Sequence, residues 1–249
     1  MTLAHRLIKE VIPGEILSVQ VGLWRTAVLA RSASGIHCGL AASLSNQDIQ
    51  QKNQNAVRDA GMLHTKSFQD LVALFESPSH TEASIGLAAI NALLPPSPLV
   101  YAEVNAHDYL ALHGKGKNIA LIGHFPFIDQ LKCSAKNLWV FDLHPYPGDL
   151  PAEAAPDYLP LADYVALTAT TLINHTFEDL IRLCRPDAKV VMLGPSTPMT
   201  QSMFEYGVNI LSGTQVIDPI ATFYGVSQGA SMHSLQEKRV IRYVTAIKP

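Results

Sequence analysis

The sequence contains few cysteines, no excess of basic residues and no long apolar run. Its cysteines, Cys38, Cys133 and Cys184, are odd in number and far apart, with no CxxC pair. We therefore expect neither a disulfide framework nor a thiolate zinc site, and a reducing cytoplasm is the expected location. Acidic residues outnumber basic ones, 21 to 18, so we expect no nucleic acid and no anionic membrane as partner.

The apolar runs are too short for a membrane protein. None reaches the ~18 residues that a spanning helix needs, and the opening residues lack the apolar stretch of a signal peptide. Hydrophobic residues make up 48% and charged residues 16% of the 249 residues, a balance that supports a sizeable core and argues against disorder. The length allows one large domain or two modest ones.

The first part of the chain is typical of an α+β unit. Closely spaced alternating segments predict an antiparallel meander of strands at 16–21, 24–30 and 36–40, and helical spacing predicts helices at 68–75 and 82–94. Gly86 inside the second helix indicates close packing against another backbone. Glu82 and Asn91 bracket that surface; they either face a site or cap and solvate the helix.

Beyond a proline cluster at 95–98, the pattern changes to alternating strands and helices. Buried strands are expected at 118–122, 138–141, 164–168, 190–193 and 208–213, a helix at 177–184, and an edge strand at 239–247. This rhythm predicts an α/β fold with a doubly wound parallel sheet. We place the domain boundary between residues 105 and 106, giving domains 1–105 and 106–249.

The most informative stretch is the turn that follows the strand 190–193. Gly194 permits unusual backbone angles, and Pro195 and Pro198 hold Ser196 and Thr197 with little freedom. Thr197 or Thr200 is expected to cap the next helix. Because ligands in open α/β sheets bind outside the carboxyl ends of strands, this turn is a candidate site; a well-capped turn without a ligand is the alternative.

The other strand ends deliver further polar groups to the same edge of the sheet. The candidates that we select there are Gly123, His124, Asp142, His144, Thr170, Thr171, Asn174, His175, Ser212 and Gly213. His124, His144 and His175 follow three different strands and could approach one another as metal ligands. They lack the local spacing that makes a ligand set specific, so solvated loop histidines are the alternative.

Two other chemistries have weak support. No GxGxxG loop follows the first strand of the second unit, although Asp142 stands where a ribose-binding acid would be expected. Ser196 lacks the second glycine of a nucleophile elbow, and no base or oxyanion hole can be assigned to it.

Three motifs together resemble the "putative heavy-metal chelation" family of bacteria and archaea. They are the helix 82–93, the run 168–174, and the turn 194–198 with Leu211-Ser212-Gly213. The resemblance implies an enolase-N-terminal-like α+β domain followed by a Rossmann-like domain, with a site in the cleft between them. The family pattern has an aromatic residue at the place of His124 and a small one at that of His175, so these histidines would not form a family-wide metal site.

The first hypothesis is a metal-homeostasis protein that binds or processes a small molecule, a metal chelate or a transition metal. Hydrogen bonds to the ligand would come from Thr170, Thr171, Asn174, Ser196 and Thr197, with Glu82 and Asn91 closing from the other domain. Glu82 and Asp142 are the candidates for a base or orienting group if the protein is catalytic. The second hypothesis is an enzyme that uses a nucleotide-like cosubstrate such as S-adenosylmethionine, and the third is a scaffold with an eroded site. Catalysis and oligomeric state stay open, with a homodimer among the options.

Overall fold

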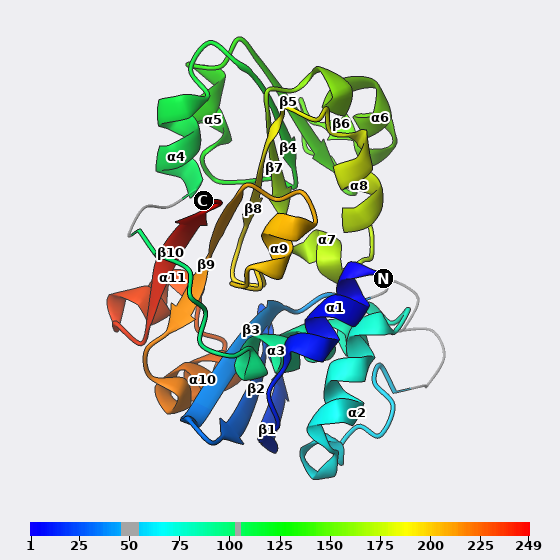
Figure 1. Cartoon of the computed structure of the whole chain (residues 1–249), viewed down its shortest axis with the longest axis vertical. Helices are drawn as coiled ribbons and strands as arrows, with labels where there is room; N and C mark the ends of the chain where they lie inside the picture. The colour runs from blue at the N-terminus through cyan, green and yellow to red at the C-terminus, as the bar shows by residue number, and fades with distance from the viewer. Residues whose placement is uncertain (46–54, 103–105) are drawn as a thin grey trace.

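The chain folds as a mixed α/β protein around two sheets (Figure 1). The computed structural model describes residues 1–45, 55–102 and 106–249, so the predicted domain boundary adjoins a segment, 103–105, outside the described part. The smaller sheet is the predicted antiparallel meander, in the order β1-β2-β3. Its strands are β1 (Glu15–Val21), β2 (Arg25–Ser32) and β3 (Gly35–Ala42).

Helix α3 (His80–Leu93) lies against β2 and β3 and is buried almost all round. The Ser79 side chain caps its first turn. A Cβ on Gly86 would overlap the backbone of Phe75, and one on Gly39 would overlap the backbone of α3. The close approach predicted from Gly86 is therefore confirmed, and Gly39 makes a second one on the sheet side. The two remaining helices of this part are α1 (Leu3–Glu10) and α2 (Phe68–Ala73).

The larger sheet has seven strands in the order β10-β9-β8-β7-β4-β5-β6. They are β4 (Asn118–Ile122), β5 (Asn137–Asp142), β6 (Leu150–Pro151), β7 (Tyr164–Thr168), β8 (Lys189–Leu193), β9 (Ile210–Val216) and β10 (Ile241–Ile247). All neighbours pair in parallel except β9 with β10. The strand order reverses between β4 and β7, as in doubly wound sheets, so the predicted fold class is confirmed.

Helices cover both faces of this sheet. One face carries α4 (Ala106–His113) and α5 (Ile128–Lys132). The other carries α6 (Ala155–Tyr158), α7 (Thr170–Ile173), α8 (Phe177–Leu183) and α9 (Ser202–Glu205). Burial on both sides explains why the strands read as near-continuous apolar runs.

The end of the chain returns to the smaller sheet. Helix α10 (Pro219–Ser227) contacts all three of its strands, and α11 (Met232–Glu237) extends the same apolar cluster, which includes Leu29, Leu40 and Leu235. The smaller sheet is thus held between α3 on one face and α10 on the other (Figure 1). The helices α3 and α10 that cover its two faces are thus far apart in the sequence.

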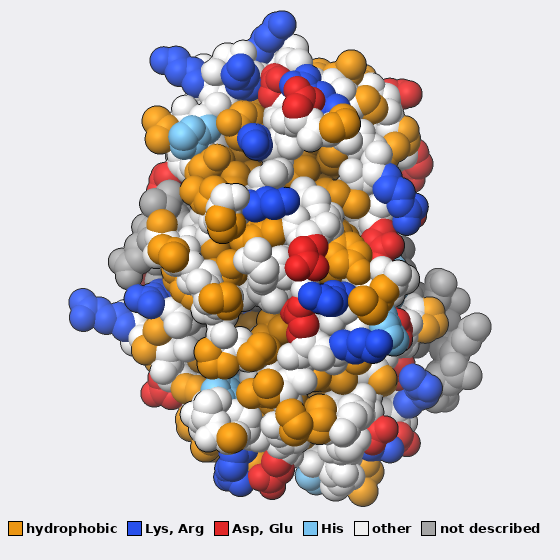
Figure 2. All heavy atoms as spheres, viewed as in Figure 1, with side chains coloured by type: hydrophobic (Ala, Val, Ile, Leu, Met, Phe, Trp, Pro, Cys, Tyr) orange, Lys and Arg blue, Asp and Glu red, His pale blue; other side chains and the backbone are white. Residues whose placement is uncertain are grey.

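The two halves also meet through α1 and α9. The Glu10 carboxylate accepts hydrogen bonds from the hydroxyls of Thr200 and Ser202, while Arg6 lies 3.5 Å from Glu205. Figure 2 shows acidic and basic side chains alternating over this junction. The expectation that Thr200 or Thr197 caps the next helix is wrong, because α9 begins without a side-chain cap and the Thr200 hydroxyl is bonded to Glu10. In the described ranges, no helix is long and apolar enough to span a bilayer.

Candidate functional site

A cavity of about 510 Å³ lies where the smaller sheet meets the carboxyl ends of β8 and β9. Its walls are β3, the end of α3 with the prolines that follow, the turn after β8, and the last residues of β9. Pockets for small molecules typically measure ~300–1,000 Å³. Of the predicted site residues, Asn91, Pro195 and Thr197 line this cavity.

The turn after β8 joins the two halves of the molecule. Gly194 has φ of +117°, in the region that favours glycine. Ser196 is 2% exposed, and its hydroxyl oxygen accepts a hydrogen bond of 2.8 Å from the amide of Ala42 on β3. The Ser196 carbonyl accepts another, of 3.1 Å, from the Asn91 side chain. Ser196 is therefore a structural link here and not an exposed nucleophile.

Hydrogen bonds of other predicted residues attach the turn to strand β9. The Thr197 hydroxyl donates to the Ser212 carbonyl over 3.2 Å, and the Thr245 hydroxyl donates to the Ser212 hydroxyl over 3.1 Å. A Cβ on Gly213 would lie 2.6 Å from the Met199 sulfur. Glycine at 213 thus allows the turn to lie directly on β9.

Two buried polar atoms beside the cavity have no hydrogen-bond partner among the described residues. They are Oδ1 of Asn91 and Oγ1 of Thr214. The Asn91 amide nitrogen is fully used, since it donates to the carbonyls of Leu40 and Ser196 over 2.9 and 3.1 Å. A buried polar atom without a partner costs about 1–3 kcal/mol. Because both residues line the cavity, these two oxygens are candidates for a contact with a ligand.

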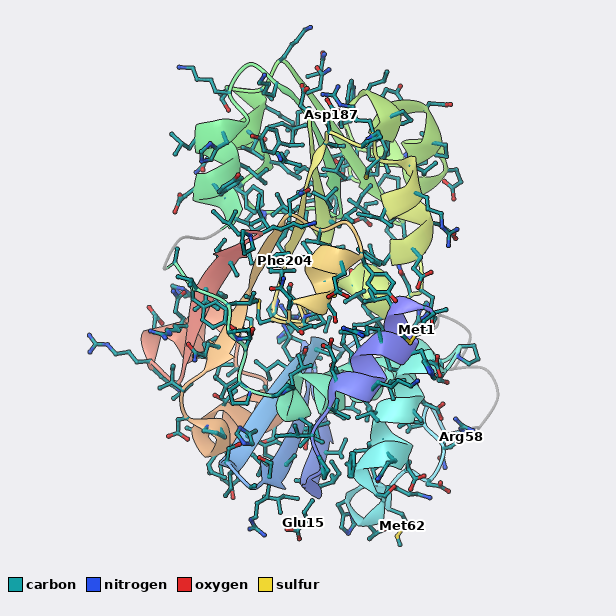
Figure 3. All side chains as sticks on the ribbon, in the orientation of Figure 1. Met1, Glu15, Arg58, Met62, Asp187 and Phe204 are labelled. Carbon is teal, nitrogen blue, oxygen red and sulfur yellow. The ribbon has the colours of Figure 1, made fainter. Side chains whose placement is uncertain are left out.

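Glu82 lies on α3 but is occupied by the protein itself. It is 4% exposed and accepts hydrogen bonds from the backbone and guanidinium of Arg58 and from the Ser77 hydroxyl, at 2.6–3.2 Å. Burial raises the pKa of Glu82, but the hydrogen bonds from Arg58 and Ser77 outweigh it and leave the pKa lowered. Figure 3 shows Arg58 on the outer side of the N-terminal half, away from Phe204 at the junction. This carboxylate fits a structural ion pair better than a base.

The predicted residues after β7 form a separate group around α7. The Thr171 hydroxyl donates to the Thr168 carbonyl over 2.7 Å, and Asn174 accepts from the Thr176 hydroxyl over 2.8 Å. The hydroxyls of Thr170 and Thr168 are 3.0 Å apart. Thr171 and His175 line a different cavity, of about 340 Å³, between α1, α8 and Phe75. The structure therefore does not bring Thr171 and Asn174 to the cavity beside Ser196.

A third group lies at the ends of β4 and β5. The Asp142 carboxylate accepts hydrogen bonds from the amides of His124 and His144, at 3.1 and 2.9 Å. His124 Nδ1 lies 2.8 Å from the carboxylate of Asp149, whose side chain is 5% exposed. Gly123, with φ of +107°, ends β4 and donates to the Phe141 carbonyl. Asp142 thus ties two loops together, and a ribose contact there stays a prediction.

The three histidines do not form a metal site. Across 1–45, 55–102 and 106–249, no group of three or more His, Cys, Asp or Glu residues could hold a metal ion. His175 is held elsewhere, because its Nε2 lies 2.8 Å from the Ser77 carbonyl on the N-terminal side. The predicted set of His124, His144 and His175 is thus wrong, because His175 follows α7 rather than the end of β7 and is bonded to the N-terminal half, although the three strands concerned are neighbours in the sheet.

The donors around the 510 Å³ cavity do not suit a bare heavy-metal ion. Soft metals are bound by thiolate and imidazole ligands. Cys38 lines the cavity, but burial raises the pKa of its thiol to about 12. His37 has its Nε2 3.0 Å from the hydroxyls of both Ser32 and Ser34. The remaining polar lining is amide, hydroxyl and backbone, which matches an organic molecule.

Sequence reasoning missed Thr214 and the far end of β9. The strand was expected to end at Gly213, but it runs on to Val216. The signal was present, since Thr214, Gln215 and Val216 continue a β-compatible run after the glycine. Gly213 therefore does not end β9. It permits the close contact with Met199.

The chain was compared with known families and proteins. Two family profiles match it, over residues 4–94 and 105–245, and both are described as "Putative heavy-metal chelation". An uncharacterized protein of Methanocaldococcus jannaschii is 26% identical over 162 residues, 61% of this chain and 62% of that protein. The match thus spans less than two thirds of that relative's length.

Two solved structures share the fold. One is a protein of unknown function from the DUF364 family of Desulfitobacterium hafniense DCB-2, with a TM-score of 0.80, 24% identity, and 99% of this chain and 98% of that one covered. The other is a DUF364 protein of unknown function from Pyrococcus horikoshii, with a TM-score of 0.81, 17% identity and 98% of each chain covered. At these identities the likeness concerns the fold alone.

Proposed function

The chain belongs to the family described as "Putative heavy-metal chelation", and we propose that it binds a small polar organic molecule in the cavity between β3 and β9. The molecule would be a chelator, free or with a transition metal that its own groups already coordinate. The observation that carries this proposal is the pair of partnerless buried atoms, Asn91 Oδ1 and Thr214 Oγ1, at the wall of a 510 Å³ cavity.

The character of the lining supports binding of a chelator more than binding of the bare ion. A chelator that presents hydroxyl or amide groups around its metal can donate an O–H or N–H to Asn91 Oδ1, and the Thr214 hydroxyl can donate or accept. The metal would then need no ligand from the protein. Since segments from both halves line the cavity, a bound molecule would also hold the halves together.

Calorimetric titration of the full-length protein tests the proposal. The probes are nickel chloride, citrate, histidine, and the nickel complexes of citrate and histidine. We expect an organic probe or its complex to bind with one site per chain, and nickel chloride alone to show no such site. Saturation at 100 times Kd adds about 2.7 kcal/mol to stability, which is a rise in Tm of roughly 5–10 °C for a chain of this size.

Cavity-filling variants locate the binding. Thr214→Trp and Ser97→Trp place bulk at two walls of the cavity, and each should abolish the heat of binding while the circular dichroism stays native. Ser227→Trp, on the exposed side of α10, is the matched control and should bind like the original protein. Unchanged binding in folded Thr214→Trp and Ser97→Trp, or stoichiometric binding of nickel alone, would contradict the proposal.

A further inference from the structure

Strand β9 continues past the strand that pairs with it. The last β8–β9 pair is Leu193 with Ser212, and the Gly194 amide then donates to the Ser212 carbonyl over 3.0 Å. At Gly194 the chain turns away, while β9 runs on to Val216 and, in the described ranges, pairs there with β10 alone. The side of β9 that β8 leaves uncovered borders the cavity, which Thr214 and Val216 both line.

The alternation of strand backbone decides which groups face this gap. The N–H and C=O of one residue point to the same edge of a strand, and those of the next residue point to the opposite edge. The Ser212 carbonyl faces β8, whereas the Ile217 amide faces β10 and donates to the Val240 carbonyl over 2.8 Å. The N–H and C=O of Thr214 and Val216 therefore face the cavity.

The opposite wall is also the edge of a sheet. Among the residues that the structure describes, strand β3 pairs with β2 and with no strand on its other side. On its outer side, the Leu40 carbonyl accepts from Asn91 and the Ala42 amide donates to Ser196. By the same alternation, the N–H and C=O of Cys38 lie on this outer side, and Cys38 lines the cavity. Two uncovered strand edges thus border one space.

The charge of the cavity restricts what can enter. Among the described residues that line it, none is Asp, Glu, Lys or Arg. The polar groups that line it are backbone amides and carbonyls and the side chains of His37, Asn91, Ser97, Tyr101, Thr197, Thr214 and Gln215. Of these, Asn91 Oδ1 and Thr214 Oγ1 are buried without a partner among the described residues. Alternating donors and acceptors without charge are complementary to a chain of amide bonds, and an extended peptide that adds to a strand edge is a recurring mode of recognition.

We propose that the ligand of this cavity contains a short, extended and uncharged peptide-like segment. The segment takes the place that β8 would occupy if it continued, and it pairs with the N–H and C=O of Thr214 and Val216. It spans three or so residues, because β9 overhangs β8 by only four residues, Gly213–Val216. This inference rests on the proposed function, of which it specifies the class of ligand.

Binding of acetyl-trialanine methylamide to the full-length protein tests the inference. The matched probe is the same peptide methylated at the amide nitrogen of its second alanine. The methyl group removes one hydrogen-bond donor and blocks strand pairing there. We expect the first peptide to bind and the methylated one to bind at least tenfold more weakly. Thr214→Val should weaken the first peptide severalfold, whereas Ser227→Ala, on the exposed side of α10, should leave its Kd unchanged.

Amide hydrogen exchange supplies a readout of where the peptide pairs. The amides of Thr214 and Val216 should exchange at least tenfold more slowly in the complex, and those at the ends of β4 and β5 should not change. Equal binding of the two peptides, or no slowing at Thr214 and Val216, would overturn the inference.

The two proposals can fail separately. If the chelators bind in a manner that Thr214→Trp abolishes, but the unmethylated peptide neither binds nor displaces them, the cavity is a ligand site and only the peptide class is wrong. If no chelator and no peptide binds, the proposed function fails together with this inference.

Discussion

Two places along the carboxyl edge of the larger sheet differ in whether their polar groups have hydrogen-bond partners. We call the ends of β4 and β5 the closed end, and those of β8 and β9 the open end. At the ends of β4 and β5, the carboxylates of Asp142 and Asp149 are bonded to three backbone amides and an imidazole, which hold the loops together. Near the ends of β8 and β9, the buried oxygens Asn91 Oδ1 and Thr214 Oγ1 have no partner among the described residues, and both residues line a cavity. Polar residues after a strand are therefore no evidence of a site until their partners are counted.

The largest effect should come from Ser196, which links the turn after β8 to the smaller sheet. Ser196→Ala leaves the buried Ala42 amide without its acceptor, so we expect the free energy of unfolding to fall by about 1–3 kcal/mol. Urea denaturation measures this loss, with Ser227→Ala as the exposed control. A loss no greater than that of the control would show that Ser196 is not the structural link described above.

A somewhat smaller loss is expected at the closed end. Asp149→Ala removes the acceptor of the Tyr146 amide and of His124, and because His124 is partly exposed its nitrogen can turn to water. We expect a loss of about 1–2 kcal/mol in urea denaturation, without any change in ligand binding at the cavity. Asp157→Ala, an exposed aspartate on α6, should change stability by less than about 0.5 kcal/mol. A lost affinity in Asp149→Ala would instead connect the two ends functionally.

The Glu82 carboxylate has hydrogen-bond partners within the protein, so it should contribute to the pH dependence of folding stability. Its pKa is lowered in the folded protein, so its contribution is fully present above the unfolded value, about 4.3. The contribution is lost as the pH falls through the lower, folded value. Glu82→Gln should therefore flatten the fall of stability below about pH 4.3, measured as Tm against pH. An unchanged acid limb would show that the Arg58 and Ser77 contacts contribute nothing.

The smallest effect should have the opposite sign. Thr214→Val replaces a partnerless hydroxyl with a methyl group of similar size, so stability should stay within about 0.5 kcal/mol or rise. Affinity for the ligand should fall nonetheless. A clear loss of stability in urea would mean that the hydroxyl is already satisfied in the free protein, which would remove the contrast between the two ends.

The regular elements could be predicted from the sequence because their signals are local. The alternation at 16–21 and the apolar run at 190–193 correspond to β1 and β8, and Gly86 indicated a close helix contact that the structure confirms. The helices α1 and α4 were missed. Helix α4 follows a proline cluster closely and has no clear apolar stripe, so its sequence carries little helical signal.

The site was harder to predict because it depends on partners from distant parts of the chain. Ser196 and Asn91 were selected and do meet, 3.1 Å apart between side-chain nitrogen and carbonyl. Glu82 and Asp142 looked equally suitable, but Arg58 and two backbone amides, which no local pattern connects to them, occupy their oxygens. The histidines follow three adjacent strands and still do not converge, because His175 lies beyond α7 with its Nε2 at the Ser77 carbonyl, while His124 Nδ1 lies at the Asp149 carboxylate.

The return of α10 and α11 to the smaller sheet has a consequence for synthesis. In the described part of the chain, the face of that sheet that carries Leu29 and Leu40 packs mainly against C-terminal residues, among them Val226, Leu235 and Ile241. While the ribosome is still making the second half, this apolar face is without its cover and is a natural target for chaperones. The first sheet to be translated is thus among the last to be completed, and a nascent chain that stalls before α10 would be prone to aggregate.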